Sequence, residues 1–272
     1  MGENCKICGV KMFEHDIALV LNKYNVAYYV CPKCGFIQTE EPYWLEEAYS
    51  RAIASADTGA IMRNISSANS LLFFMQFIDN NGRCLDFGGG HGILTRIMRD
   101  YGFDFYHYDK YAVNLYANGF EGNLEEKFVL ITSFENFEHF VEPIKEIEKL
   151  LKQTEVLYFS TELIPKENTQ SPPPPRIKDW WYYSPSTGQH ISFYSKKTLE
   201  YIARVFDVNY MPVNNGTHIF SKRRINNKYF KGLKYYNKLM NLNISRFLKK
   251  KSKTMEDMYK VIAMSESKKN GT

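Results

Sequence analysis

The sequence lacks any long apolar run. No stretch of about 18 consecutive apolar residues occurs among its 272 residues, so we expect no membrane-spanning helix. The start of the chain also lacks the basic segment and apolar segment that make a secretory signal. Met1-Gly2 is not followed by Ser or Thr at the sixth position, as N-myristoylation favours, because Lys6 stands there. We therefore expect a cytoplasmic protein.

Cysteine is scarce, with five residues in the chain, and four of them form two C-x-x-C pairs. The pairs are Cys5 with Cys8 and Cys31 with Cys34, and a glycine follows each pair. Two such turns can place four thiolates around one tetrahedral zinc ion. A cytoplasmic setting argues against disulfides, and a redox role needs only one pair. We predict a closed, structural zinc site.

The N-terminal segment around these cysteines predicts a small zinc-binding domain. Residues 18–30, "ALVLNKYNVAYYV", have the pattern of a strand, a turn and a second strand. A zinc ribbon over residues 1–40 is too small to hold a core without its metal. Residues 41–79 follow with the pattern of two helices, which we interpret as a helical linker or cap.

Residues 80–223 alternate between strand and helix patterns. This alternation predicts an α/β domain with a doubly wound, mostly parallel sheet. Ligands of such sheets bind at the carboxyl ends of the strands. The expected strands are 82–87, 103–109, 127–134, 155–161, 207–213 and 217–223, and the expected helices are 92–102, 142–153 and 195–206.

A glycine-rich loop follows the first of these strands in "CLDFGGGHG". The dinucleotide fingerprint G-x-G-x-x-G requires a glycine where this chain has Ile93. The spacing is instead Asp86-x-Gly88-x-Gly90-x-Gly92. An acid at this place can meet an ammonium group, and the N–H groups at the start of a helix suit a carboxylate. The loop therefore favours a ligand with an amino acid portion.

A second acidic residue, Asp109, ends the next expected strand. It follows Gly88 at the distance typical of an acid that accepts hydrogen bonds from ribose hydroxyls. The ligand predicted by the two motifs together carries an ammonium group, a carboxylate and a ribose.

The segments "LDFGGGHG", "YHYD" and "ITSFENFEHF", in this order, resemble class I S-adenosylmethionine-dependent methyltransferases. The resemblance spans residues 80–223 and implies a Rossmann-like sheet of seven strands with an antiparallel last strand. The third strand of that family is expected within residues 115–122, and no acid for the adenine amino group is evident. The cofactor contacts that the resemblance implies are Asp86, Gly88, Gly89, Gly90, Gly92, Asp109, Ser133 and Phe134.

Three residues are candidates for a catalytic role, and two of them, His139 and His190, are candidates for the base. His139 follows the strand whose end faces the methyl group in the family, and it forms a Glu-His pair with Glu138. Imidazole has the intrinsic pKa that a base needs. The alternative is that the pair starts a helix and contacts the surroundings of the cofactor. His190 is the second histidine that we expect near the reaction.

An aromatic segment follows four consecutive prolines, residues 172–175, which predict a stiff loop. Aromatic faces beside amide and imidazole groups suit a carbohydrate. The alternative is an aromatic plug that packs the loop onto the core. The candidate substrate-binding residues are Trp180, Trp181, Tyr182, Tyr183 and Gln189.

The combination of the Cys₄ module and this aromatic segment is similar to methyltransferases that act on bacterial surface polysaccharides. It predicts O-methylation of a sugar in a surface glycan or in its nucleotide-linked precursor. Sugar C-methyltransferases with a zinc module are also similar, but they carry a large additional domain for which this chain has no room. Two further hypotheses are an RNA methyltransferase and a non-catalytic binding module.

The C-terminal segment 224–272 is strongly basic. From Lys222 onward the net charge is +12, whereas the preceding residues carry −7. We expect a helical tail that contacts the inner face of a membrane or another polyanion. The alternatives are that it binds RNA, although the acidic body would repel a phosphate backbone, or that it packs on the body as a plain helical extension.

Overall fold

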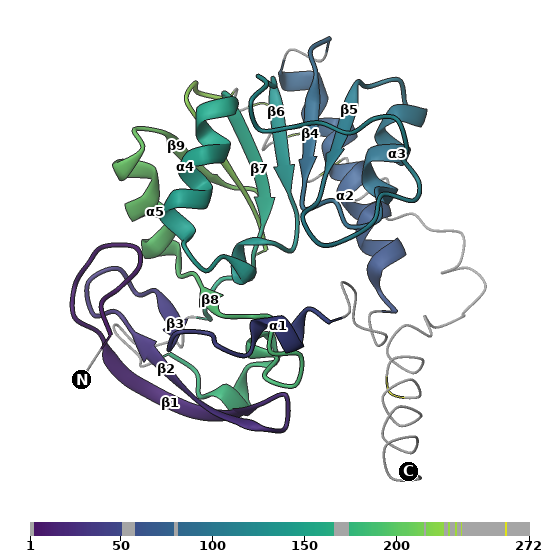
Figure 1. Ribbon diagram of the computed structural model, residues 1–272. Coiled ribbons are helices and arrows are strands. Elements are labelled where there is room, and N and C mark those ends of the chain that lie inside the picture. The colour runs from purple at the N-terminus through teal and green to yellow at the C-terminus, as the bar shows by residue number, and fades with distance from the viewer. Residues whose placement is uncertain are drawn as a thin grey trace, which may run out of the picture.

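The structure is a computed structural model that describes residues 3–50, 58–78, 81–165, 174–214 and 216–225, and the single residues 228, 232, 235 and 259. Nearly all of the predicted basic tail lies outside the described residues, as do the first two of the four prolines. The described chain forms a large sheet covered by helices and a smaller sheet beneath it (Figure 1).

The large sheet has six strands in the order β5-β4-β6-β7-β10-β9. The first four run parallel to one another, and β10 pairs antiparallel with both of its neighbours, as predicted for the last strand. The carboxyl ends of the parallel strands therefore meet at one edge. The strands are β4 (Cys84–Phe87), β5 (Phe105–Tyr108), β6 (Leu130–Ser133), β7 (Val156–Ser160), β9 (Asn209–Pro212) and β10 (Thr217–Ser221).

The seventh strand that the sequence analysis predicted is not formed. In residues 115–122, all of which are described, one parallel bridge between Glu121 and His107 is what remains of it. Side-chain hydrogen bonds form there instead. The Asn114 side-chain oxygen accepts one from the Ala117 N–H, and the Asn114 side-chain amide donates one to the Glu121 carboxylate. These local bonds favour turns over a strand ladder.

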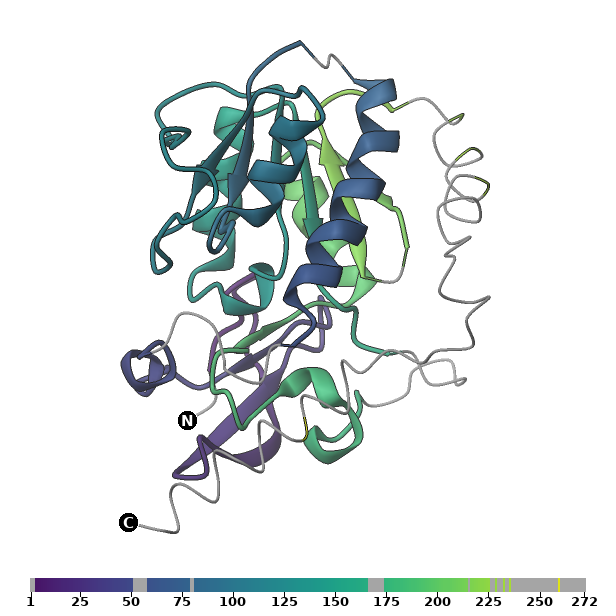
Figure 2. The same ribbon diagram turned by 90° about the vertical axis from the view of Figure 1, so that its right-hand side faces the viewer.

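Helices cover both faces of the large sheet (Figures 1 and 2). Because side chains alternate along a strand, neighbours such as Cys84 and Leu85 enter opposite layers of the core. The first layer contains α2 and α3, and the second contains α4 and α5. These helices are α2 (Ala60–Phe74), α3 (Ile93–Asp100), α4 (Pro143–Gln153) and α5 (Lys196–Val205), with a short η1 (Met75–Phe77) after α2.

The predicted start of α5 is confirmed in atomic detail. The Ser195 hydroxyl oxygen accepts a hydrogen bond from the Thr198 N–H at 3.1 Å, and the Thr198 hydroxyl accepts one from the Ser195 N–H. This capping box satisfies N–H groups that have no partner inside the helix. The Thr198 hydroxyl also donates to the carbonyl of Cys34, which ties α5 to the cysteine turns.

The smaller sheet joins two distant parts of the chain. Its order is β1-β2-β3-β8, and β8 pairs antiparallel with β3 through Ile37–Phe193 and Gln38–Ser192. The predicted strand-turn-strand pattern corresponds to β1 and β2. The sheet extends across the boundary predicted at residue 40, because it needs β8 from beyond β7. Its strands are β1 (Phe13–Val20), β2 (Tyr24–Val30), β3 (Ile37–Thr39) and β8 (Ser192–Phe193).

Short helices complete the core of this smaller unit. They are α1 (Leu45–Ala48), η3 (Ile177–Asp179) and η4 (Trp181–Tyr183), and their buried side chains pack with Trp44, Val26 and Phe193. The Trp44 indole N–H donates to the Gly188 carbonyl at 2.8 Å, so the N-terminal segment and the later segment share one core.

Candidate functional site

Two adjoining cavities lie at the carboxyl ends of the parallel strands. The larger has a volume of about 700 Å³ and the smaller about 350 Å³. Gly88, Gly90 and Glu135 line both cavities. A single elongated ligand can therefore occupy the two cavities, which is the position that the doubly wound fold predicts for its ligand.

The glycine loop brings the backbone close to this shared space. Gly88 and Gly89 donate backbone hydrogen bonds to the Tyr108 carbonyl, which holds the loop against β5. Gly90 has φ of +57°, and a Cβ atom there would meet no protein atom within 4 Å. Since Gly90 lines both cavities, that Cβ would occupy space in them. The loop has the form of a cradle for a ligand.

Asp86 lies at the floor of the larger cavity and is 2% exposed. Its carboxylate accepts hydrogen bonds from the Thr132 and Thr95 hydroxyls at 3.0 and 3.2 Å. Burial raises its pKa to about 6, although the two hydroxyls oppose this effect. A buried carboxylate of this kind favours a cationic group beside it.

Asp109 lines the smaller cavity, but its carboxylate also organises the loops. One oxygen accepts hydrogen bonds from the Tyr111 and Ala112 N–H groups at 2.7 Å, and the other accepts one from the Gly90 N–H at 2.9 Å. Each carboxylate oxygen has two lone pairs, so the oxygen that binds Gly90 keeps one for a ligand hydroxyl.

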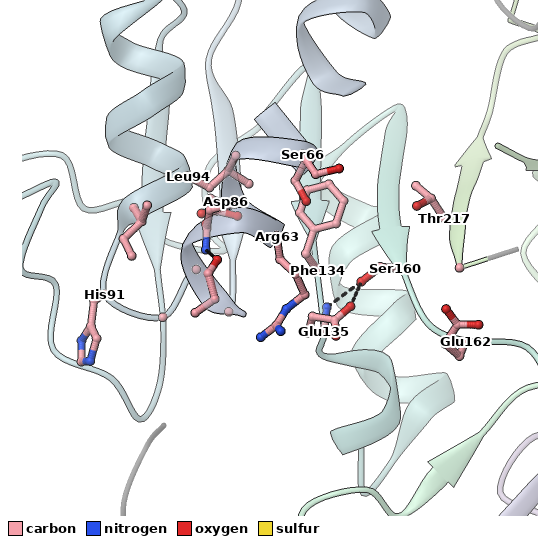
Figure 3. A pocket seen from close by; sticks show the side chains of 18 of the residues that line it. Arg63, Ser66, Asp86, His91, Leu94, Phe134, Glu135, Ser160, Glu162 and Thr217 are labelled. Atoms are coloured by element: carbon pink, nitrogen blue, oxygen red, sulfur yellow. Dashed lines mark hydrogen bonds between the residues drawn. The ribbon is translucent and has the colours of Figure 1, made fainter. Parts of the chain in front are cut away.

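The strand end beyond β6 holds a residue that sequence reasoning missed. Glu135 has φ of +55°, which is rare for a non-glycine residue and marks a position where strain is stored. Its N–H donates to the Ser160 hydroxyl oxygen at 2.8 Å, and its carboxylate accepts from that hydroxyl at 2.7 Å. Figure 3 shows this pair, with Arg63 and Glu162, around the larger cavity. No sequence pattern signals the φ of Glu135.

The two predicted cofactor residues before Glu135 differ in position. Phe134 lines the larger cavity (Figure 3). Ser133 is fully buried, and its hydroxyl has no hydrogen-bond partner among the described residues.

Glu138, His139 and His190 come together, as sequence reasoning anticipated for a catalytic group. One potential ligand atom from each residue lies within 4.8 Å of those of the other two. The centroids of the two imidazole rings are 5.0 Å apart. His139 lines the smaller cavity, whereas Glu138 is fully buried. The His139 Nε2 atom lies 3.9 Å from the Glu138 carboxylate, so it faces the buried acid.

Burial sets the charges of this group. It lowers the pKa of His139 to about 3, with the nearby His190 adding to the effect, and lowers that of His190 to about 4. It also raises the pKa of Glu138, and Glu135 adds to this by like-charge repulsion. Both histidines are therefore neutral at pH 7.

The aromatic segment does not form the predicted sugar platform. Trp180, Tyr182 and Tyr183 are at most 7% exposed and belong to the core of the smaller unit, as in the aromatic-plug alternative. Trp181 alone among the four is exposed, at 76%, and it lines neither cavity. Gln189 lines the smaller cavity, with its amide donating to the Ala48 carbonyl. The rings of Trp180, Tyr182 and Tyr183 point inward because they pack against apolar residues of the small sheet.

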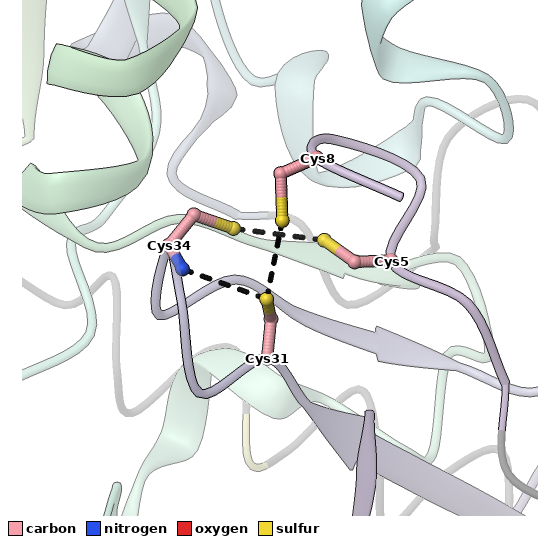
Figure 4. Close-up of side chains that lie close together, drawn as sticks. All are labelled: Cys5, Cys8, Cys31 and Cys34. Atoms are coloured by element: carbon pink, nitrogen blue, oxygen red, sulfur yellow. Dashed lines mark hydrogen bonds between the residues drawn. The ribbon is translucent and has the colours of Figure 1, made fainter. Parts of the chain in front are cut away.

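The four cysteines converge as the spacing predicted (Figure 4). The Sγ–Sγ distances are 3.6 Å for Cys5–Cys34 and 3.4 Å for Cys8–Cys31, and none of the four is in a disulfide. A hydrogen bond from Cys34 lowers the pKa of the Cys5 thiol to about 6. Each C-x-x-C turn ends on a glycine with φ of +72°, so the two turns have the same form. The cluster is a candidate metal centre.

Comparison with protein families identifies the large unit. Residues 62–213 match a family described as "Methyltransferase domain". The chain belongs to this family. The prediction of an S-adenosylmethionine-dependent methyltransferase is thus confirmed at the level of the family. No curated protein matches the chain.

Solved structures of methyltransferases are similar to this chain in part. CalO1, a methyltransferase of calicheamicin biosynthesis in its SAH-bound form, is 12% identical with a TM-score of 0.38, and 58% of this chain aligns with 54% of it. An O-methyltransferase family protein from Burkholderia thailandensis is 11% identical with a TM-score of 0.45, over 65% of this chain and 62% of that protein. The chain thus covers less than two thirds of either protein.

The methyltransferase has no membrane-spanning candidate among its described residues. None of the helices in that part of the chain is both long and apolar enough to cross a bilayer.

Proposed function

We propose that this methyltransferase transfers the methyl group of S-adenosylmethionine to a hydroxyl group of a sugar. The observation that carries the proposal is the pair of adjoining cavities with Gly88, Gly90 and Glu135 in the walls of both. The smaller cavity suits a nucleoside, and the larger suits an amino acid portion together with an acceptor.

The residues present fit that cofactor. Asp109 offers a carboxylate lone pair for ribose hydroxyls in the smaller cavity. In the larger cavity Asp86 suits an ammonium group, and Arg63 and the N–H groups at the start of α3 suit a carboxylate. When bound, S-adenosylmethionine supplies an electrophilic methyl group on a sulfonium.

The protein's own task is to orient the acceptor and remove its proton. Glu135 lies where the two cavities meet, and its hydrogen bond from Ser160 fixes the carboxylate. We propose that Glu135 accepts the proton of the acceptor hydroxyl as the oxygen–carbon bond forms. His139, predicted as the base, has its Nε2 atom directed toward the Glu138 carboxylate. To act as the base, it needs the acceptor hydroxyl to lie between these two groups.

The walls of the larger cavity favour a polyhydroxylated acceptor. Nine of the residues that line it carry hydroxyl, amide or carboxylate groups, which can read sugar hydroxyls by hydrogen bonds, beside the apolar Ile93, Leu94 and Phe134. Three carboxylates in these walls, Asp86, Glu135 and Glu162, disfavour a phosphate backbone and hence RNA. A sugar of a bacterial surface glycan or its nucleotide-linked precursor, as the sequence resemblance implies, is the acceptor that we propose. The wall residues with hydroxyl or amide groups are Asn64, Ser66, Ser67, Ser160, Asn214 and Thr217.

We further propose that the four cysteines hold structural zinc. A tetrahedral ion with Zn–S bonds of about 2.3 Å places sulfur atoms about 3.8 Å apart, close to the two distances observed. Four thiolates leave no open position, so this ion would stabilise the smaller unit without taking part in the reaction.

Two measurements test the proposed function. Thermal-shift titration with S-adenosylmethionine is expected to stabilise the protein, and absence of stabilisation at millimolar cofactor would contradict cofactor binding. Transfer of a labelled methyl group is then measured with free sugars, nucleotide sugars and RNA. Labelling of sugars is expected; labelling confined to RNA would refute the sugar proposal.

A further inference from the structure

Glu138, His139 and His190 form an unusual group of hydrogen-bond acceptors. Glu138 is fully buried, and neither carboxylate oxygen has a hydrogen-bond partner among the described residues. A buried, unpartnered carboxylate is costly unless a cation or a donor meets it. The groups within reach are the Tyr182 hydroxyl and the imidazoles, with His139 Nε2 at 3.9 Å.

The hydrogen bonds of both imidazoles show which nitrogen carries the proton. His139 Nδ1 lies 3.0 Å from the Gln189 carbonyl oxygen, and His190 Nδ1 lies 2.6 Å from the Tyr182 carbonyl oxygen. A carbonyl oxygen only accepts, so each Nδ1 donates. In neutral rings both Nε2 atoms are then bare acceptors. Each of the three residues places one potential ligand atom within 4.8 Å of those of the other two.

This arrangement is the one that metal-binding histidines show. Such residues donate one ring N–H to a carbonyl or a carboxylate, which fixes the tautomer and directs the other nitrogen at the metal. We propose that Glu138, His139 and His190 bind a divalent first-row transition metal ion through two imidazoles and one carboxylate. Metal bonds of about 2.1 Å allow ligand atoms to be at most about 4.2 Å apart, so small rotations from the observed separations close the site.

The ligand set indicates the class of metal. Two imidazoles and one carboxylate suit zinc, manganese or iron(II), and three protein ligands leave coordination positions open. His139 lines the smaller cavity, so the open positions adjoin the space of a bound ligand. The site is separate from the four cysteines, which belong to other segments of the chain.

The ion would also join the two units of the molecule. Glu138 and His139 belong to η2 (Phe137–His139), directly after β6 of the large sheet. His190 belongs to the segment that leads into β8 of the small sheet. The Ile191 N–H donates to the Glu138 carbonyl at 2.8 Å, which already holds these segments together.

The test is the metal content of the full-length protein after equilibration with zinc chloride and removal of free metal. Wild type is expected to hold two zinc ions per chain, one in each site. Glu138→Gln keeps the side-chain shape, and His190→Asn keeps an N–H donor for the Tyr182 carbonyl; each is expected to hold one ion. His218→Asn, which alters another buried histidine, is the control and is expected to hold two.

Cobalt(II) provides a readout that does not depend on the variants. The cysteine site gives thiolate-to-cobalt charge-transfer absorption, and the second equivalent is expected to add visible bands without further thiolate absorption. One ion per wild-type chain, or two ions in both folded variants, would overturn the proposal. Cofactor binding is measured separately by thermal shift, so failure of the proposed function and failure of this site are distinguishable.

Discussion

The carboxylate of Glu135 accepts a hydrogen bond from the Ser160 hydroxyl at 2.7 Å, while the Glu135 N–H donates to the same hydroxyl oxygen at 2.8 Å. This double contact joins the ends of β6 and β7. It holds a left-handed glutamate at the place where both cavities meet. A carboxylate fixed in this way is suited to remove a proton.

Glu135→Gln is expected to lower kcat by about 10²- to 10⁴-fold, because the amide cannot accept the acceptor proton. The affinity for S-adenosylmethionine is expected to change little. Methyl transfer is measured with labelled cofactor and the acceptor sugar. Glu162→Gln, in the wall of the same cavity, is the matched control. Full activity in Glu135→Gln together with a large loss in His139→Asn would assign the proton to the histidine.

Gly90→Ala is expected to weaken binding of S-adenosylhomocysteine by about tenfold or more, or about 1.4 kcal/mol, because its Cβ enters the space that the cavities share. The left-handed backbone also costs about 1–2 kcal/mol of folding stability. Gly102→Ala is the matched control, since its φ is +91° and its Cβ also meets no atom within 4 Å. Calorimetry should show a loss of affinity in Gly90→Ala only; equal affinities would contradict the cradle.

Cys34→Ser is expected to abolish metal binding at the four-cysteine cluster and to lower the thermal midpoint strongly. The reason is that three sulfur ligands hold zinc less tightly than four and that the bound metal contributes to folding stability. Cys84→Ser changes the fifth cysteine, which lies outside the cluster, and should keep the metal. Elemental analysis and calorimetry decide the matter, and an unchanged zinc content in Cys34→Ser would exclude the proposed centre.

His218 is expected to make stability depend on pH. Its imidazole is fully buried between the Thr161 carbonyl and the Tyr210 hydroxyl, and burial lowers its pKa to about 4. Between pH 6.5 and 4 the unfolded chain binds a proton that the folded chain does not. The free energy of unfolding therefore falls as the pH is lowered, by about 1.4 kcal/mol per unit and about 3 kcal/mol in total.

The measurement for His218 is denaturant unfolding of wild type and His218→Asn at several pH values. The difference between their unfolding free energies should shrink as the pH falls through this window, because the variant lacks the titrating group. A difference that stays constant from pH 7 to pH 4 would show that His218 has an ordinary pKa.

Trp180→Ala is expected to lower the stability of the protein strongly, whereas Trp181→Ala, at the adjacent residue, is expected to leave it almost unchanged. Trp180 is 7% exposed, so its loss should cost about 3–5 kcal/mol of stability. Trp181 is 76% exposed, so its loss should stay within about 0.5 kcal/mol. Equal destabilisation in chemical unfolding would contradict the buried aromatic core.

Much of the large sheet is predictable from sequence because its strands and helices have strong periodicity and clear boundaries. Ser195 at the start of α5 is an example, whereas the antiparallel direction of β10 was implied by the family resemblance. The prediction of a seventh strand was wrong, and in that segment the Asn114 side chain binds the Ala117 backbone N–H, a competition that composition does not reveal. The inward orientation of Trp180 depends on a sheet formed from distant segments, which periodicity cannot detect.

The site was predictable where motifs are local. The glycine loop, Asp109 and the four cysteines follow from spacing alone; the structure places the loop and Asp109 at the cavities and brings the four cysteines into one cluster. Glu135 was missed because its role depends on a backbone angle. The approach of His139 and His190 was anticipated by chemistry, but their shared orientation depends on two backbone carbonyls.

The pairing of β3 with β8 has a consequence for synthesis on the ribosome. Residues 37–39 leave the ribosome more than 150 residues before their partners at 192–193, so the small sheet has an open edge while the intervening residues are made. The methyltransferase sheet can begin to assemble in that interval, since β4, β5, β6 and β7 are all made before β8. The small sheet is therefore begun before the large sheet and completed only after four strands of the large sheet have been made.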